Sequence, residues 1–121
     1  MRLAPILLLL AASLASGQTP AREAFAKGVT EFRANRIAAA ADLFRQAAQL
    51  EPSMAEAHAN LGKCAYLLGR SEEAIEALRT AIRLQPGVAE PHYDLGHAYL
   101  LAKKVDEALS EFEILDRMEP A

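Results

Sequence analysis

The sequence predicts an all-α fold in which antiparallel helix pairs stack side by side into an α-solenoid. The first observation is a 34-residue repeat that runs through the chain after residue 20. Five positions keep this offset: Gly28, Gly62 and Gly96; Ala40, Ala74 and Ala108; Pro52, Pro86 and Pro120; Phe44, Leu78 and Phe112; Leu50, Leu84 and Met118. The second observation is a composition that is 52% hydrophobic, rich in alanine, but only 6% aromatic, which suits closely packed helices. A repeat of this length is typical of a two-helix unit that buries its apolar face against copies of itself.

Residues 1–17 predict a secretory signal peptide. Arg2 precedes an uncharged apolar run over residues 3–15, which is too short to span a bilayer, and small residues follow at its end. We expect cleavage after Ala15 or Gly17 and an exported mature chain, periplasmic or extracellular, with no membrane span of its own. An uncleaved membrane anchor is the alternative. A lipid-anchored lipoprotein is not expected, because no cysteine follows the run.

The chain after residue 17 predicts one domain over residues 18–121 with three repeats, 21–54, 55–88 and 89–121. Each repeat consists of two helices, and the six helices are expected over residues 20–34, 37–50, 54–68, 71–84, 88–102 and 105–118. Thr19 and Pro20 form a cap followed by a proline at the first helical position. Ser53 and Glu56 have the spacing of a capping box, and Gly69 marks the end of a helix.

The repeated glycines lie inside the first helix of each pair, where glycine costs about 1 kcal/mol relative to alanine. We expect each glycine to face the repeated alanine of its partner helix, Ala40, Ala74 or Ala108, so that the two backbones approach closely. The sequence therefore predicts tight contact within each pair.

The middle repeat carries a recognisable motif in Asn60-Leu61-Gly62, Tyr66, Gly69-Arg70, Glu73-Ala74, Leu78, Ala81, Leu84 and Pro86. The third repeat matches it through Leu95-Gly96, Tyr99, Glu107-Ala108, Phe112 and Pro120, and the first through Gly28, Ala40, Phe44, Ala47 and Pro52. This pattern resembles the tetratricopeptide repeat over residues 21–121. The resemblance implies a right-handed superhelix in which the first helices line a concave groove that holds a peptide or partner protein.

The candidate groove residues follow from helical spacing along the exposed stripe of each first helix. They are Phe25, Val29, Phe32 and Arg33; Asn60, Lys63, Tyr66 and Leu67; and Tyr93, His97, Leu100 and Leu101. Ala59 shares the second stripe. Asn60 is placed to bond the backbone of a bound peptide, and the mainly apolar surface suits an amphipathic helix or an extended segment. The alternative is that several of these rings belong to the core between repeats.

Some tetratricopeptide domains clamp the terminal carboxylates of chaperones with lysines, asparagines and an arginine. The corresponding positions here hold Phe25, Val29, Asn60, Glu90 and Asp94. Only Asn60 fits that pattern, and the two acids would repel a carboxylate. This partner class is therefore not expected.

The two ends of the predicted array differ in polarity. Lys27 and Glu31 replace the apolar residues of later repeats, so the first repeat is expected to begin the array. In the last helix, Ile114, Leu115 and Met118 are apolar, and without a following helix they are expected to stay open. These three residues predict either a contact with a further repeat or self-association.

Charge and chemistry exclude several classes of function. The mature chain has 16 acidic and 12 basic residues, which argues against binding to nucleic acid or to anionic lipid. No phosphate loop, nucleophile elbow or zinc motif is present, so neither an enzyme nor a cofactor is expected. His58 and His92 lack the second ligand that a metal site requires. Cys64 is the single cysteine; we expect it to be buried, and a reactive thiol is the alternative.

These observations together predict an exported, non-catalytic adaptor or scaffold that binds a protein or peptide. The alternative is a structural role, as the N-terminal portion of a larger envelope protein or as a self-associating assembly unit.

Overall fold

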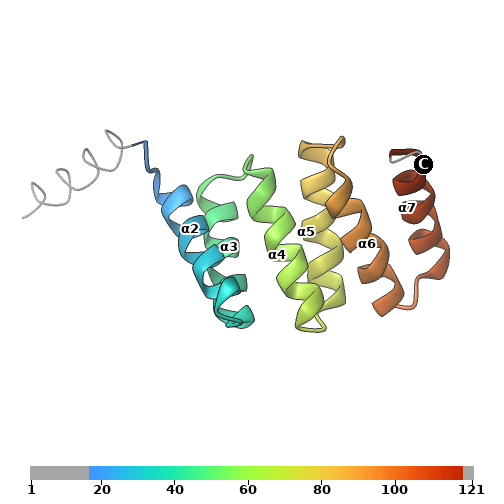
Figure 1. The fold of residues 1–121 in the computed structure, drawn as a ribbon, viewed down its shortest axis with the longest axis horizontal. Helices are drawn as coiled ribbons and strands as arrows, with labels where there is room; N and C mark the ends of the chain where they lie inside the picture. Colours follow the sequence, from blue (N-terminus) through green and yellow to red (C-terminus); the bar gives the residue numbers. More distant parts are fainter. Residues whose placement is uncertain (1–16, 119–121) are drawn as a thin grey trace, which may run out of the picture.

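A computed structural model describes residues 17–118 as a single row of α-helices (Figure 1). They are α2 (Pro20–Arg33), α3 (Ile37–Leu50), α4 (Ala55–Leu67), α5 (Ser71–Leu84), α6 (Ala89–Leu101) and α7 (Val105–Met118). In this range the structure contains no strand, and the expected helix limits are right to within one residue. The all-α solenoid of antiparallel helix pairs is thus confirmed. The predicted signal peptide, apart from Gly17, and Pro120 lie outside the described residues.

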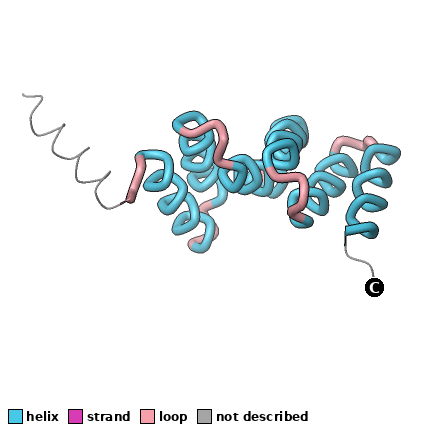
Figure 2. Tube along the Cα trace, turned by 90° about the horizontal axis from the view of Figure 1, so that it is seen from above, coloured by secondary structure: helices cyan, strands magenta, loops and turns pink. Residues whose placement is uncertain are grey.

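The helices contact mainly their neighbours along the chain. The largest contacts join α2 to α3, α4 to α5 and α6 to α7, and smaller ones join α3 to α4 and α5 to α6. Seen from above, the three pairs follow one another along the long axis, with α2 and α7 at opposite ends (Figure 2). None of the helices in residues 17–118 is long and apolar enough to cross a membrane.

The first helix of each pair ends in the same turn. Asn35, Gly69 and Lys103, each 34 residues apart, have positive φ angles of 62°, 76° and 62°. At Gly69 two bonds close the turn, from Gly69 N to Tyr66 O at 3.0 Å and from Arg70 N to Ala65 O at 2.8 Å. The same pair of bonds recurs at Asn35 and Lys103. This is the Schellman arrangement, which satisfies the free carbonyls of the last turn, and it confirms that Gly69 ends its helix.

The helix starts agree only in part with the sequence predictions. Thr19 caps α2 as expected, since its Oγ1 accepts a hydrogen bond from Arg22 N at 3.1 Å and Pro20 follows it. The capping box at Ser53 is wrong. Met54, not Ser53, is the residue that caps α4, and no side chain bonds the free N–H groups. Met54 is only 4% exposed, so burying its side chain fixes the start of the helix one residue later.

The glycines do allow close contact within each pair, but against larger side chains than expected. A Cβ on Gly28 would lie 2.8 Å from Phe44 Cε1, one on Gly62 2.8 Å from Leu78 Cδ2, and one on Gly96 2.5 Å from Phe112 Cε1. The expected partner Ala74 contributes only its carbonyl oxygen, 3.3 Å from the same point on Gly62. Each glycine therefore makes room for a large side chain of the partner helix. The small alanine one turn away on that helix is not the residue that needs this space.

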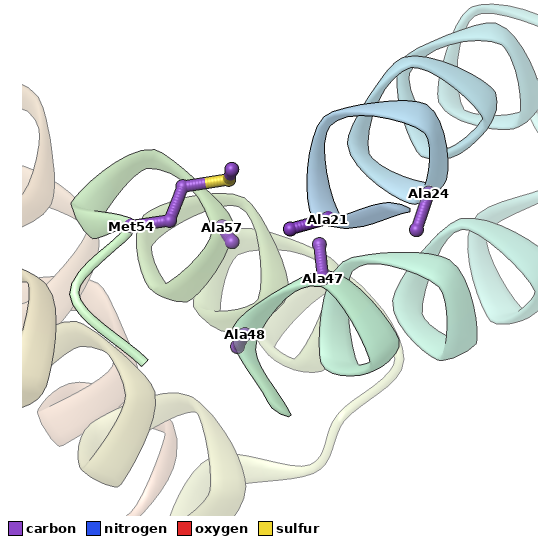
Figure 3. Close-up of a cluster of buried hydrophobic side chains, with 6 residues drawn as sticks. All are labelled: Ala21, Ala24, Ala47, Ala48, Met54 and Ala57. Atoms are coloured by element: carbon purple, nitrogen blue, oxygen red, sulfur yellow. The ribbon is translucent and has the colours of Figure 1, made fainter. Parts of the chain in front are cut away.

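Small residues fill most of the core between helices. One buried cluster joins α2, α3 and the start of α4 through Ala21, Ala24, Ala47, Ala48, Met54 and Ala57 (Figure 3). Two further clusters, around Phe44 and around Leu78, continue the core along the row. Because alanine side chains are short, the helices pack closely. Close packing fixes the positions of α2, α4 and α6, the first helices of the three pairs, relative to one another.

We expect Gly62→Leu to destabilise the protein severely, because Leu78 already occupies the space that the new side chain needs. Overpacking of this kind typically costs about 1–3 kcal/mol of unfolding free energy. Thermal unfolding followed by circular dichroism measures the loss. Gly87→Ala is the control, because a Cβ at Gly87 meets nothing within 4 Å. A Gly62→Leu melting temperature within a degree or two of the parent would contradict the close-contact argument.

Candidate functional site

A groove lined by the first helices contains two cavities. We call it the first-helix groove. The cavity between α2 and α4 has a volume of about 240 Å³ and is lined by Val29, Phe32, Arg33, Phe44, Asn60 and Lys63. The cavity between α4 and α6, of about 270 Å³, is lined by Phe25, Ala55, Glu56, Ala59, Asn60, Lys63, Ala81, Gln85, Val88, Glu90, Pro91 and Asp94. Both are smaller than the roughly 300–1,000 Å³ typical of small-molecule sites, so each suits a side chain of a larger ligand.

Asn60 and Lys63 on α4 lie at the centre of the groove, because both line both cavities. Asn60 is half-buried. Within residues 17–118 its side-chain amide makes no hydrogen bond, so its donor and acceptor remain available to a ligand. An amide in this position is suited to pair with a peptide backbone.

Lys63 crosses from α4 to two acids of α6. Its Nζ forms an ion pair with Glu90 and lies 3.9 Å from an Asp94 oxygen. Burial opposes the charged form of Lys63, but Glu90 and Asp94 outweigh it and raise the pKa of the lysine. Burial also raises the pKa of Asp94, although Lys63 opposes this shift. Lys63 is therefore charged and already engaged.

The structure gives the apolar candidates of the first stripe a second role. Phe25, Val29 and Phe32 are half-buried and pack against the core cluster around Phe44. The rings of Phe25 and Phe44 have centroids 5.4 Å apart. These side chains therefore border the groove and also belong to the core between repeats. Arg33 lies beside them, exposed, at the edge of the α2–α4 cavity.

The remaining candidates divide into a ring cluster and exposed leucines. His97 lies between Tyr66 and Tyr93, with ring centroids 6.2 Å and 4.5 Å away respectively. Leu67, Leu100 and Leu101 are exposed at the ends of α4 and α6 and line neither of the two groove cavities. The structure thus brings Asn60, Lys63 and the first stripe together but leaves these leucines at the margin.

Sequence reasoning missed Glu56, Glu90 and Asp94 as lining residues of the groove. Sequence reasoning considered Glu90 and Asp94 only as residues that would repel the terminal carboxylate of a chaperone. A signal was nevertheless present, because Glu90 follows Glu56 by 34 residues and Asp94 follows Asn60 by the same offset. Residues at one register position share an orientation, so the groove-facing position of Asn60 also places Asp94 there.

His58 and His92 bond to the same backbone position in adjacent repeats. His58 Nε2 lies 2.9 Å from Pro52 O, and His92 Nε2 lies 3.3 Å from Pro86 O. His92 is buried, and its Nδ1 lies 2.7 Å from a Glu111 oxygen. Each histidine therefore ties the loop before its helix to that helix. Within residues 17–118 no three His, Cys, Asp or Glu side chains come together as a metal site would require.

The far end of the row differs from the prediction for α7. Ile114, Leu115 and Met118 are half-buried rather than open. The apolar side chains that α7 exposes are Val105 and Leu109, at 55% and 54%. Leu109 corresponds to Ile75 in the previous repeat, which is only 6% exposed because α6 covers it. The exposed face of α7 around Leu109 therefore corresponds to the face of α5 that packs against the next repeat.

A family model for the tetratricopeptide repeat matches residues 25–89 and 68–120, which together span most of the chain. This chain belongs to the tetratricopeptide repeat family. Tetratricopeptide repeats are in general non-catalytic protein-interaction folds. A search of curated proteins gives no significant match.

Solved structures with the same repeat resemble the chain closely. A structure of a MamA mutant is 26% identical, with a TM-score of 0.80, over 93% of this chain and 82% of that one. Another MamA structure is 28% identical, with a TM-score of 0.76, over 81% of this chain and 57% of that chain. The first tetratricopeptide domain of Spaghetti (RPAP3), bound to the HSP90 peptide SRMEEVD, is 20% identical. Its TM-score is 0.79 over 83% of this chain and 79% of that chain, and this likeness shows the fold alone.

We expect Cys64 to be unreactive in the folded protein. Its side chain is fully buried, as predicted, and burial raises the pKa of the thiol to about 11. At pH 8 only about one molecule in a thousand would then carry the reactive thiolate, and reactivity should rise with pH. A chromogenic thiol reagent should label Cys64 only after denaturation. Ser110→Cys, at an exposed position of α7, is the control that should react at once. Rapid labelling of native Cys64 would contradict this prediction.

Proposed function

We propose that this chain is an exported, non-catalytic interaction module of three tetratricopeptide repeats, and that its first-helix groove holds a peptide or helix of a partner protein. The family supports the general role, since its repeats form a protein-interaction fold. The site itself is argued from the geometry of α2, α4 and α6.

The proposal depends mainly on the position of the Asn60 side chain. Asn60 lies between the two cavities and is half-buried, and its side-chain amide makes no hydrogen bond within residues 17–118. A polar group in that setting gains from a partner that it can bond, and an extended backbone supplies both a donor and an acceptor. The neighbouring cavities then receive side chains of the same segment.

The Spaghetti domain supports a peptide ligand but not the same peptide. SRMEEVD, the HSP90 peptide bound to that domain, has three acidic residues among its last four. Glu90 and Asp94 line the groove of the present chain, and their charge opposes such a ligand. We therefore propose a different peptide for this groove.

Site-specific photo-crosslinking of residues 18–121 tests the groove. A photoreactive residue at Ala59, in the groove, should capture partner protein from an extract of the source cells, and one at Arg83 on α5 should not. Asn60→Ala should reduce capture from position 59 at least fivefold, because each bond to a backbone group contributes about 1 kcal/mol, which corresponds to about a fivefold change in affinity. Equal capture from both positions, or none from position 59, would contradict binding in the groove.

Export is part of the same proposal, and its basis is the short apolar run with small residues at its end over residues 1–17. Mass spectrometry of the native protein should find an N-terminus at Ser16 or Gln18, according to which cleavage site is used. An intact Met1 would favour the uncleaved anchor instead.

A second candidate function is self-association through α7, which the exposed side chains of Val105 and Leu109 support. An exposed apolar patch often marks an interface. Asp106, Glu113 and Asp116 are exposed on the same helix and would repel each other in a symmetric pair. Salt screens such repulsion, so association should strengthen as the salt concentration rises.

We expect the mature chain to self-associate at micromolar concentration and Leu109→Lys to make it monomeric, because the lysine would place a charge in the contact. Ile114→Lys with Leu115→Gln should instead act mainly by lowering stability, since both side chains are half-buried. Leu50→Lys on α3 is the matched control, at 52% exposure and far from α7. Sedimentation at high salt measures the effect. A folded parent that stays monomeric there would exclude this function.

A further inference from the structure

The charge of the first-helix groove changes sign along its length. Around the α2–α4 cavity the charged residues are the bases Arg33 and Lys63. Around the α4–α6 cavity three acids, Glu56, Glu90 and Asp94, share the single base Lys63. The α4–α6 end of the groove therefore carries two negative charges that no base in its lining balances.

The repeat register shows that this acidity belongs to one end of the row. Asp94 corresponds to Asn60 in the second repeat and to Ala26 in the first. Glu90 corresponds to Glu56 and to Arg22. Each step along the row thus adds negative charge, and the cavity between α4 and α6 is the first to face acids from two helices.

Asp94 is incompletely satisfied. Only 14% of its side chain is exposed, and its ion pair with Lys63 is 3.9 Å long, too long for a hydrogen bond. No group in residues 17–118 donates a hydrogen bond to the Asp94 side chain. Glu90 holds Lys63 more closely, so the lysine cannot neutralise both acids. A carboxylate in this state gains from a cationic donor brought by a ligand.

The walls of the same cavity suit the stem of a long basic side chain. Phe25, Val88 and Ala59 line it beside the acids. Arginine and lysine lay their methylene groups on apolar surface while the charged head reaches a polar partner. Arginine adds a planar fork of donors that matches carboxylate oxygens.

We infer that the α4–α6 cavity binds a basic side chain of the partner peptide, arginine in preference to lysine, with its charged head on Asp94 and Glu90 and its stem along Phe25 and Val88. This inference rests on the groove as the binding site of the proposed function. It adds the chemistry of the ligand: a peptide whose residue at this cavity is basic. The expected ligand is therefore basic at this cavity, opposite in charge to an acidic chaperone tail.

An array of short random peptides tests the inference with residues 18–121. In each set one position is fixed as arginine, lysine, glutamate or leucine. The arginine set should bind best, and the glutamate set should bind worst. Glu90→Gln with Asp94→Asn should weaken binding of the arginine set about tenfold or more and leave the leucine set unchanged, because the two amides can form only neutral bonds, which are roughly half as strong as charge-assisted ones.

The matched control is Asp42→Asn with Glu72→Gln, which removes two exposed acids outside the groove. It changes the net charge by the same amount and should leave the arginine preference unchanged. Circular dichroism verifies that all variants fold. If the control weakens arginine binding as strongly as the groove variant, the preference reflects net charge, and the inference is wrong.

Two further results separate this inference from the proposed function. If the glutamate or leucine set binds best, while photo-crosslinking from position 59 still captures a partner, the groove binds peptides but the basic-residue inference fails. If no peptide set binds and position 59 captures nothing, the groove function fails and the inference fails with it.

Discussion

The tight contact within each helix pair is the constraint on which the rest of this structure depends. Gly62 lies so close to Leu78 that no Cβ fits between them, and Gly28 and Gly96 stand in the same relation to Phe44 and Phe112. Each large side chain inserts where the facing helix has none of its own. The pair becomes a rigid unit with one residual apolar face, and that face is what stacks on the next pair.

The position of the groove follows from this stacking. The core between pairs consists largely of alanine, so the spacing of α2, α4 and α6 leaves little freedom for the helices to shift. Asn60 and Lys63 project from the middle helix of this trio, which is why they border a cavity on either side. The half-buried rings of Phe25 and Phe32 contribute to the core and border the groove at once, so stability and ligand contact depend on the same residues.

The architecture was predictable from sequence because one 34-residue period appears at five register positions, and a period of that length is typical of a two-helix unit. The start of α4 was not, since a buried Met54 outweighs the hydroxyl of Ser53 in fixing where the helix begins. The acidic lining was missed for a different reason. Whether Glu90 and Asp94 face solvent or a cavity depends on the angle between α4 and α6, and helical spacing within one helix does not contain that angle. The exposed face of α7 was misplaced on Ile114 and its neighbours, although the correspondence between Leu109 and Ile75 carried the answer.

The restriction of the main contacts to neighbouring helices has a consequence for how this protein folds. No large contact joins α2 to α7, so the two ends of the row are energetically almost independent. A local contact map of this kind favours fast folding that can nucleate in any pair and spread outward. It also allows partial opening. Within residues 17–118 Leu109 on α7 is 54% exposed, so this end can detach while α2 to α5 remain folded. A ligand that spans α4 and α6 would oppose that opening. Binding would therefore make the unfolding of the whole row more cooperative, although in the free protein its two ends can unfold separately.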